Sequence, residues 1–327
     1  MRAVICRDLS GPSALVLEDL PRPEPGEGEV LIRVHAAGVN FADSLVTAGK
    51  YQEKHQPPFT PGFEAAGIIE AVGPGVASCR PGERVMATLS KGGFADYAIA
   101  RASDVHAIPD RMDFVTAAGF PIAWGTSHYG LVHRCGLKAG EVLLVHGAAG
   151  GVGLTAVEVG AALGATVIAT AGGPEKLAVA QAHGATHLID YKSEDIRERV
   201  KEITGGRGAD VVYDPVGGNV FDASLRCTAP NGRILVVGFA GGNVPQIPAN
   251  ILLVKNITVI GYYWGAYRQL DPEGMRASFR QLMEWYEQGR LKPLVSASFD
   301  LADTPAAIES LLSRKSTGKV VITTGAV

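Results

Sequence analysis

Cysteine is scarce in this chain, and its few cysteines stand far apart. The four positions are Cys6, Cys79, Cys135 and Cys227. No two of them form a C-x-x-C pair, so neither a structural zinc knot nor a disulfide framework is indicated. We therefore expect a protein of a reducing compartment.

Long apolar runs and an excess of basic residues are also missing. The N-terminal stretch lacks the apolar core of a signal peptide, and no run reaches membrane-spanning length, which predicts a cytoplasmic location. The net charge is -3 with no basic stripe, which argues against nucleic acid as the main partner. The composition, 46% hydrophobic and 19% charged, is typical of a globular protein. Because 327 residues are too many for one ordinary core, we expect two domains.

The first part of the chain, residues 1–122, has the rhythm of short strands. Alternating apolar and polar residues, broken by proline and glycine turns, occur at 29–40, 64–76 and 83–89. This pattern is typical of a compact, β-barrel-like domain.

From residue 123 onward, strands alternate with helical segments. The apolar runs are VLLVHG, TVIATA, HLIDY, ADVVYD, RILVVGFA and ITVIGYYW. Six such runs with helices between them predict a doubly wound parallel sheet over residues 123–265. The segment 266–327 is expected to return to the first domain. It begins with an amphipathic helix over 275–291, whose apolar face is formed by Phe279, Leu282, Met283 and Tyr286.

The most informative stretch joins the first of these runs to the next helix. It reads VLLVHGAAGGVG, residues 142–153. The backbone N–H groups of such a turn and the positive end of the helix dipole form a site for a dinucleotide pyrophosphate. Ala148 takes the first position of G-x-G-x-x-G, Gly150 would admit the phosphates, and Gly153 would let the helix approach its strand. The alternative is an ordinary strand–turn–helix corner. The residues expected to line the phosphates are Ala149, Gly150, Gly151 and Val152.

An acidic residue is absent where an NAD-specific site would carry one, at the end of the second strand of the sheet. Ala171 stands there, followed by Gly172. Without a carboxylate to repel a 2′-phosphate, Lys176 can supply positive charge and Tyr191 a hydrogen bond. Lys176 could instead be a solvated helix residue, Tyr191 a packing residue, and the Glu175 carboxylate could turn inward. We expect NADPH as the cofactor, with Gly172, Lys176 and Tyr191 at its 2′-phosphate.

The order of the domains and several motifs resemble the medium-chain dehydrogenase/reductase superfamily over essentially the whole chain. In its zinc alcohol dehydrogenases, one metal ligand is a cysteine where this chain has Asn40, in VNFAD. A second ligand is a histidine where this chain has Phe63, in PGFEAAG. Neither replacement is a good zinc ligand. The motifs VNFAD, AAGGVG, VVYDPVGG and TGKVV resemble the zinc-independent quinone oxidoreductase branch.

That resemblance implies an α/β protein with a GroES-like β-rich catalytic domain and a six-stranded Rossmann domain. It also implies NADPH-dependent hydride transfer to quinones or α,β-unsaturated carbonyls. Asn40 would donate to a substrate carbonyl or a ribose hydroxyl, and Tyr51 would hydrogen-bond a substrate oxygen. Asn40 could instead cap a turn, and Tyr51 could be a lid or packing residue. Leu45 replaces a second pocket tyrosine of some relatives, so the identity of the quinone stays open.

Further cofactor contacts are implied at the carboxyl ends of the strands, where ligands bind in open α/β sheets. They are Phe239, Ala240, Tyr263 and Trp264. Thr126, where the chain enters the nucleotide domain, could contact the nicotinamide ribose, and the other cofactor contacts expected are Asn40, Val216 and Lys319. Trp264 could instead pack in the core or at a subunit contact, and Lys319 could be solvated. No metal is expected, because the histidines form no ligand constellation.

Three functions compete for this pattern. The first is the quinone or enone reductase, and the second is a 2-enal or enoyl-CoA (acryloyl-CoA) reductase. The third is an NADPH-binding protein without turnover, in a structural or RNA-binding role that the acidic charge disfavours. One- or two-electron reduction and the proton donor stay open. The apolar run Ile257–Trp264 is expected to pair with its copy in a homodimer, which would cover an exposed sheet edge.

Overall fold

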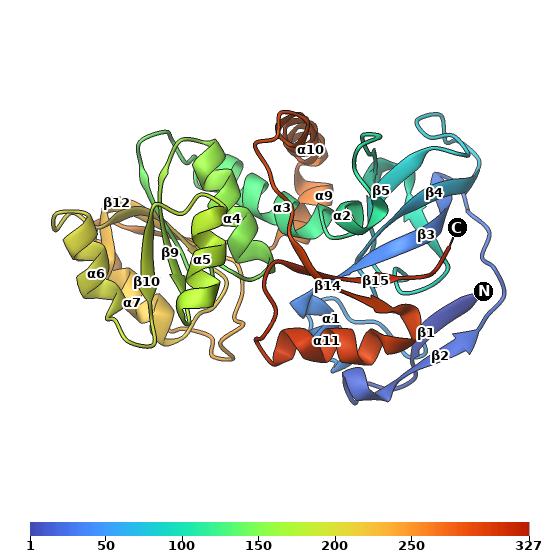
Figure 1. Ribbon diagram of the computed structural model, residues 1–327, viewed down its shortest axis with the longest axis horizontal. Helices are drawn as coiled ribbons and strands as arrows, with labels where there is room; N and C mark the ends of the chain where they lie inside the picture. The colour runs from blue at the N-terminus through green and yellow to red at the C-terminus, as the bar shows by residue number, and fades with distance from the viewer. Residues whose placement is uncertain (327) are drawn as a thin grey trace. The chain divides into compact units, whose positions relative to one another are not determined.

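The computed structural model describes residues 1–326 and divides into two compact units (Figure 1). Unit 1 contains Met1–Ile122 and the chain from Pro293 onward, and unit 2 contains Ala123–Lys292. Each unit has its own sheet and its own apolar core, as expected for a chain of this length.

Unit 1 is built on a seven-stranded sheet in the order β14-β15-β3-β4-β5-β7, with β6 paired to β3. The strands are β3 (Glu29–Val39), β4 (Glu64–Val72), β5 (Arg84–Thr88), β6 (Tyr97–Arg101), β7 (Val105–Ala107), β14 (Val295–Asp300) and β15 (Lys319–Thr323). A separate antiparallel pair is formed by β1 (Arg2–Cys6) and β2 (Leu15–Asp19). The predicted β-rich domain is confirmed.

Short helices pack on the unit 1 sheet. They are α1 (Phe41–Thr47), α2 (Phe114–Ala118) and α11 (Thr304–Leu312), with single 3-10 turns at Pro12–Ala14, Ala102–Asp104 and Leu301–Asp303. Ala307 and Ile308 of α11 are buried in the same core as Val320 of β15. Because β15 is antiparallel to β3 with Val320 opposite Val39, Lys319 lies level with the residue that follows β3.

Unit 2 contains a six-stranded sheet in the order β10-β9-β8-β11-β12-β13, in which every pairing is parallel. The strands are β8 (Val142–Val145), β9 (Thr166–Ala171), β10 (His187–Asp190), β11 (Ala209–Asp214), β12 (Thr228–Val236) and β13 (Thr258–Gly261). All six predicted runs form strands, and their order is that of a doubly wound sheet. The change of direction in strand order lies between β8 and β11, where such sheets bind ligands.

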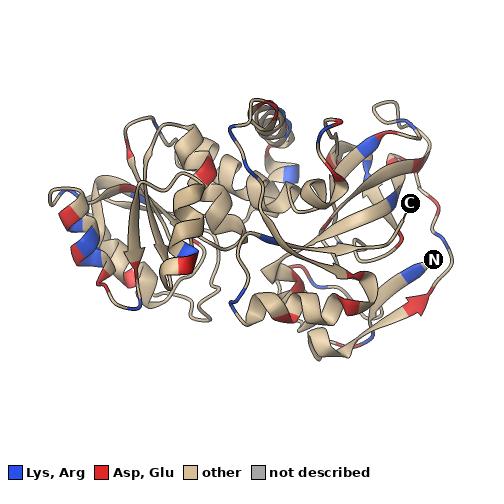
Figure 2. Cartoon of the chain, viewed as in Figure 1, with Lys and Arg blue, Asp and Glu red and all other residues tan. Residues whose placement is uncertain are grey.

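Helices connect these strands. They are α3 (Pro121–Tyr129), a π-helical turn (Gly130–Arg134), α4 (Gly151–Ala162), α5 (Pro174–Ala182), α6 (Ile196–Ile203), α7 (Asn219–Cys227) and α8 (Ala249–Lys255). After β13 come a 3-10 turn (Trp264–Ala266), α9 (Tyr267–Leu270) and α10 (Pro272–Glu287). On α6, basic and acidic residues are interspersed (Figure 2), and Arg199 pairs with Glu194 at 2.8 Å. No helix within residues 1–326 combines the length and the apolar character that a membrane crossing requires.

The chain returns to unit 1 later than the sequence pattern predicted. The predicted returning segment was 266–327, but residues up to Lys292 belong to unit 2 and the return begins at Pro293. The reason is that α10 buries its apolar face in unit 2, where Phe279 packs edge-on against Trp264 with ring centroids 6.3 Å apart. The predicted apolar face of this helix included Tyr286, but the structure buries Trp285 there instead.

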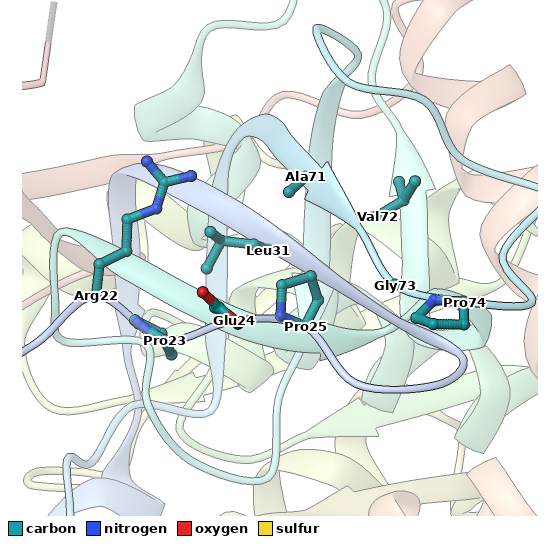
Figure 3. Close-up of a pocket in the computed structure, with 9 residues that line it drawn as sticks. All are labelled: Arg22, Pro23, Glu24, Pro25, Leu31, Ala71, Val72, Gly73 and Pro74. Atoms are coloured by element: carbon teal, nitrogen blue, oxygen red, sulfur yellow. The ribbon is translucent and has the colours of Figure 1, made fainter.

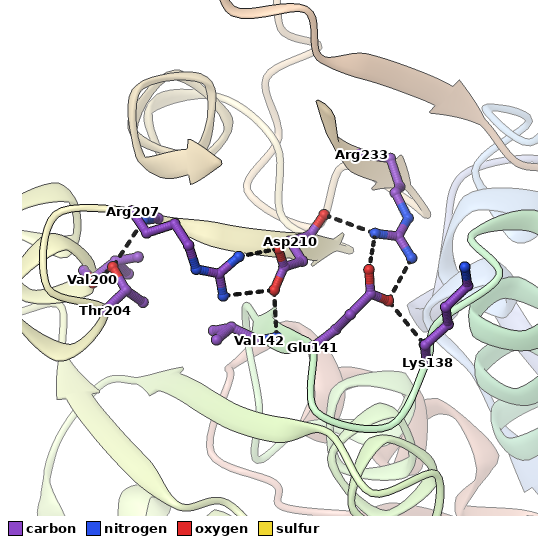
Figure 4. Close-up of polar contacts among 9 residues, drawn as sticks. Lys138, Glu141, Val142, Val200, Thr204, Arg207, Asp210 and Arg233 are labelled. Carbon is purple, nitrogen blue, oxygen red and sulfur yellow. Dashed lines mark hydrogen bonds and ion pairs between the residues drawn. The ribbon is translucent and has the colours of Figure 1, made fainter. Parts of the chain in front are cut away.

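A polar brace joins the starts of β8 and β11 to Arg233, which lies within β12 (Figure 4). The Arg233 guanidinium donates to both Glu141 oxygens at 2.7 Å and to the carbonyls of Cys135 and Asp210. The Asp210 carboxylate accepts from Arg207 at 2.9 Å and from the Val142 N–H at 2.7 Å. Hydrogen bonding to Arg233 lowers the pKa of Glu141. This brace fixes the amino ends of β8 and β11 to β12 and leaves the carboxyl ends of the strands to the loops described next.

Candidate active site

The turn after β8 has the geometry of a phosphate-binding loop. Gly147 has a φ of +59°, a conformation that favours glycine, and its carbonyl accepts the Gly150 N–H at 2.9 Å. A methyl group at Gly153 would lie 2.1 Å from the Gly147 oxygen, so only glycine lets α4 approach the turn this closely. The role predicted for Gly153 is therefore confirmed. The glycine of the tight turn is Gly147, one residue before the predicted Ala148, and its place directly after the apolar run was the available signal.

The amino end of α4 is open to an anion. Gly150 is the N-cap, and it has no side chain that could cap the helix. Ala149 lies in the turn before it, and Gly151 and Val152 are the first two helical residues. The first N–H groups of a helix have no intrahelical acceptor and carry its positive dipole end. Within residues 1–326, and apart from adjacent residues, a methyl group placed at Gly150 would have one neighbour within 4 Å, the Gly147 oxygen at 3.4 Å. The turn therefore fits the pyrophosphate of a dinucleotide.

A buried histidine anchors this turn from beneath. His146 Nε2 lies 2.7 Å from the Ser224 hydroxyl, and Nδ1 lies 3.0 Å from the Thr170 hydroxyl. Because the Ser224 hydroxyl donates to the Val220 carbonyl, it accepts from Nε2–H, and Nδ1 then accepts from Thr170. Burial lowers the pKa of His146, so the ring is neutral. The link from β8 to β9 and α7 could not be foreseen from the sequence, since Ser224 is distant along the chain.

The end of β9 carries no carboxylate, and cationic and phenolic groups lie over it. A methyl group at Gly172 would lie 2.7 Å from the Tyr191 hydroxyl oxygen and 3.0 Å from Cε of Lys192. Tyr191 is 46% exposed, which does not fit a purely packing role. The Asp190 carboxylate accepts the N–H groups of Gly173 at 3.1 Å and Lys192 at 3.0 Å, and so fixes both loops.

Lys192 was not selected from the sequence, although it directly follows the predicted Tyr191. The predicted Lys176 is half-buried in the first turn of α5, and Glu175 is exposed. This exposure removes the reason to expect the Glu175 carboxylate to turn inward.

Loops after β11 and β12 lie beside the phosphate turn. Val216 donates its N–H to Asp214 at 2.8 Å, and its Cγ2 would lie 3.4 Å from a methyl group at Gly147. The Ala240 N–H donates to the Pro215 carbonyl at 3.0 Å. Phe239 precedes it and is 38% exposed. The structure thus brings the predicted Val216, Phe239 and Ala240 to one edge of the unit 2 sheet.

Three other predicted cofactor residues are on α3 and after β13. Thr126 is buried, and its carbonyl accepts from the Tyr262 hydroxyl at 2.9 Å. Trp264 is buried, and its ring lies against Gly125, where an added methyl group would lie 2.5 Å from the ring. Most of the Trp264 side chain therefore packs in the core, as the alternative interpretation proposed. The Trp264 indole N–H nevertheless has no hydrogen-bond partner among residues 1–326. Tyr263 is half-buried in the preceding position. Cofactor contact at these residues stays a prediction.

Unit 1 contains a buried polar cluster that includes two predicted site residues, Asn40 and Lys319. Lys319 Nζ donates to Asn40 Oδ1 at 2.7 Å, to Glu64 Oε1 at 2.9 Å and to the Val39 carbonyl at 3.0 Å. Asn40 Nδ2 donates to Glu64 Oε1 at 2.8 Å, and Glu64 Oε2 accepts the Ile122 N–H at 2.8 Å. The Lys319 side chain is only 4% exposed, which contradicts the solvated alternative.

Asn40 also begins a helix, as one of the sequence alternatives proposed. It is the N-cap of α1, and its backbone N–H donates to the Asp43 carboxylate at 2.7 Å. Asp43 is fully buried, and desolvation raises its pKa to about 7. Asn40 thus takes part in a capping box with Asp43, and its carboxamide also belongs to the cluster with Lys319. Glu64 and Asp43 were not selected from the sequence, although both lie within the motifs quoted for Phe63 and Asn40.

The surroundings of Tyr51 are aromatic. Its ring lies 5.4 Å from that of Phe63, centroid to centroid, and both rings contact the apolar core of unit 1. Phe63 stands where the zinc alcohol dehydrogenases have a histidine ligand, and here its ring is part of the apolar core. No group of three or more potential metal-ligating side chains is found within residues 1–326.

A hollow elsewhere on unit 1 contains none of the predicted residues (Figure 3). Its volume is about 450 Å³, and it lies between the segment before β3 and the end of β4. Its lining residues are Arg22, Pro23, Glu24, Pro25, Leu31, Ala71, Val72, Gly73 and Pro74. Four of these nine are proline or glycine.

Two family models match the chain. The alcohol dehydrogenase GroES-like domain matches residues 26–110, and the zinc-binding dehydrogenase family matches residues 151–288. The chain is 44% identical to quinone oxidoreductase-like protein 2 homolog of Nematostella vectensis, covering 99% of this chain and 89% of that protein. It is 32% identical to human quinone oxidoreductase, covering 98% and 97%.

Solved structures agree with these relatives. Quinone oxidoreductase of Escherichia coli, solved in complex with NADPH, superposes with a TM-score of 0.93 at 31% identity, covering 99% of this chain and 100% of that one. The enzyme of Thermus thermophilus, also solved with NADPH, gives a TM-score of 0.87 at 34% identity, with the same coverage. With the doubly wound sheet, the GroES-like unit and Asn40 and Phe63 at the compared positions, the chain belongs to the quinone oxidoreductase branch of the medium-chain dehydrogenase/reductase superfamily.

Proposed function

We propose that this protein is an NADPH-dependent reductase that transfers hydride to quinones or to α,β-unsaturated carbonyl compounds. The observation that carries the proposal is the carboxyl edge of the unit 2 sheet. There the uncapped amino end of α4 follows the positive-φ Gly147, and the end of β9 presents Tyr191 and Lys192 instead of a carboxylate. The solved relatives that contain NADPH support this choice of cofactor.

The proposed NADPH site uses several loops of that edge. The pyrophosphate lies on the backbone of Ala149–Val152, where N–H groups and the helix dipole face it. Tyr191 and Lys192, with Lys176 on α5, hold the 2′-phosphate near Gly172. The residues proposed for the nicotinamide half are Thr126, Val216, Phe239, Ala240, Tyr263 and Trp264. When bound, NADPH supplies a hydride from C4 of its nicotinamide ring.

The proposed reaction adds one hydride and one proton to the acceptor. A quinone, NADPH and a proton give a hydroquinone and NADP⁺, so two electrons move together with the hydride. Negative charge develops on the acceptor oxygen, and a proton from solvent then completes the reduction, on that oxygen for a quinone and on the α-carbon for an α,β-unsaturated carbonyl. Asn40 and Tyr51 of unit 1 are proposed to hydrogen-bond this oxygen.

Initial rates test the proposal. NADPH and NADH are each assayed with a naphthoquinone, a 2-alkenal and an enoyl-CoA. We expect turnover of the quinone or the enal, with NADPH preferred by at least about tenfold, which equals ~1.4 kcal/mol of 2′-phosphate recognition. Turnover of the enoyl-CoA alone would favour the enoyl-CoA reductase. Tight NADPH binding without oxidation by any acceptor would favour a non-catalytic role.

We also propose that the protein is a homodimer joined at β13, the edge strand of the unit 2 sheet. Leu253 and Val254 on the neighbouring helix α8 are 77% and 76% exposed, and Ile247 before it is also exposed. An unpaired strand beside exposed apolar side chains is suited to pairing with its own copy. In sedimentation velocity, Leu253→Glu/Val254→Glu is expected to be monomeric, while Val16→Glu in unit 1, also at an exposed valine, stays dimeric. A monomeric unmodified protein would contradict this proposal.

The four cysteines, all buried and free, support a reducing, cytoplasmic location. Fractionation of cells that produce the protein, followed by immunoblotting, tests this location. Recovery in a membrane or secreted fraction would contradict it.

A further inference from the structure

We propose that Lys319 is a positioning residue: together with Glu64 it orients the Asn40 carboxamide, so that Asn40 presents one N–H to the acceptor oxygen. This inference rests on the proposed reductase function and assigns Lys319 a role through Asn40 instead of direct contact with NADPH. Each step follows from the hydrogen bonds of the buried cluster in unit 1.

The Lys319 ammonium has no N–H group left for a cofactor. An ammonium group has three donors. Lys319 uses them on Asn40 Oδ1, Glu64 Oε1 and the Val39 carbonyl, at 2.7, 2.9 and 3.0 Å. All three acceptors belong to unit 1, and the side chain is almost fully buried.

The two charged neighbours, Lys319 and Glu64, determine the directions in which Oδ1 and Nδ2 of the Asn40 carboxamide point. An ammonium group can only donate, so it selects the Oδ1 end, and an ionised carboxylate can only accept, so Glu64 selects the Nδ2 end. Exchanging the two ends would place like hydrogen-bonding groups against each other. One Nδ2 hydrogen is used on Glu64, and the other faces the Gly38 carbonyl at 3.5 Å, which is long for a hydrogen bond. The second N–H of Asn40 therefore makes only this weak contact, and a negatively charged acceptor oxygen can replace the Gly38 carbonyl as its partner.

The backbone leaves room for this arrangement. A methyl group at Gly38 would lie 2.2 Å from Glu64 Oε1, and one at Gly119 would lie 3.1 Å from Cβ of Lys319. Glu64 Oε2 is bound to the Ile122 N–H, so the carboxylate cannot turn away from Asn40. These hydrogen bonds of Lys319 and Glu64 are thus all made within unit 1.

This orientation suits the proposed chemistry. Hydride addition places negative charge on the acceptor oxygen, and a preoriented N–H donor stabilises that charge without reorganisation. The positive charge of Lys319 on Oδ1 polarises the carboxamide and strengthens its N–H as a donor. Lys319 contributes to the transition state only while Asn40 is present.

The test measures kcat, KM for NADPH and thermal unfolding for four variants. They are Asn40→Leu, Lys319→Met/Glu64→Gln, the combination of these three substitutions, and Lys255→Met. The double variant replaces the buried ion pair by neutral side chains of similar size, so neither partner of the pair is left charged without the other. Lys255 is the matched control, because its ammonium also donates to backbone carbonyls, those of Leu225 and Arg226, but in unit 2.

We expect Lys319→Met/Glu64→Gln to lower kcat on the order of a hundredfold, the effect of losing one oxyanion-stabilising donor, with KM for NADPH within about twofold. Asn40→Leu should lower kcat as much, and the triple variant should be no slower, since the groups act through one N–H. Lys255→Met should change neither constant. Two results would overturn the inference: kcat losses that multiply in the triple variant, or an increase in KM for NADPH with kcat unchanged. If the unmodified protein reduces no quinone or enal, the reductase proposal itself fails.

Discussion

Two glycines of the phosphate turn allow folding and cofactor binding to be separated. At Gly153 an added methyl group would lie 2.1 Å from the backbone oxygen of Gly147, and at Gly150 it would lie 3.4 Å from the same atom. Gly153→Ala therefore forces α4 away from the turn, whereas a side chain at Gly150 meets only an ordinary contact within the protein. We expect Gly153→Ala to lower both stability and NADPH binding, and Gly150→Val to lower binding alone.

The magnitudes follow from the contacts. Overpacking of this kind costs about 1–3 kcal/mol, so Gly153→Ala should shift urea unfolding by that amount. A charged hydrogen bond contributes about 1.5–3 kcal/mol, so losing two backbone N–H contacts to the pyrophosphate should weaken NADPH by more than a hundredfold in Gly150→Val. NADPH fluorescence titration and urea unfolding of both variants measure these effects. Unchanged NADPH affinity in Gly150→Val would show that the pyrophosphate does not lie on this turn.

Three further outcomes are expected. Lys192→Ala and Tyr191→Phe should weaken NADPH by up to about 1.5–3 kcal/mol while leaving NADH unchanged, measured by KM; equal losses for both cofactors would exclude contact with the 2′-phosphate. The pKa of buried Asp43 is about 7, above that of an unfolded aspartate. The free energy of unfolding, relative to that of Asp43→Asn, should therefore fall as the pH rises from about 4 to 7 and then level off. An increase over this pH range in urea unfolding would contradict this sign. Arg233→Met leaves Glu141 without its guanidinium partner and should cost about 2–3 kcal/mol in the same assay; an unchanged midpoint would mean that the brace does not stabilise the sheet.

The strands and the phosphate turn were predictable because their signals are local. Six apolar runs became six parallel strands, and the apolar-to-glycine break at residues 142–153 became a strand, turn and helix. The absence of a carboxylate at Ala171, which predicted NADPH, could also be recognised from the sequence, because this position is the end of a single strand. The motif did not identify Gly147 as the residue of the tight turn, because spacing alone does not tell which position has a positive φ.

The helix Pro272–Glu287 illustrates where local signals fail. Its amphipathic pattern predicted a helix correctly, but not the unit against which its apolar face packs. That choice depends on the shape of the core that Phe279 and Trp264 share. The return to unit 1 was therefore placed at residue 266 in the prediction and lies at Pro293 in the structure.

By itself, the sequence determined the two-domain plan, the doubly wound sheet, the lack of clustered cysteines and the glycine turn, because each depends on neighbouring residues or on composition. Only the tertiary structure brought Lys319 and Glu64 to Asn40, Lys192 to Gly172, and Ser224 to His146. These contacts join residues far apart in the chain, and they depend on strand register and side-chain packing, which residue types and spacing do not specify. The buried charged groups, Lys319 and Glu64, were therefore the part of the candidate site that only the tertiary structure could reveal.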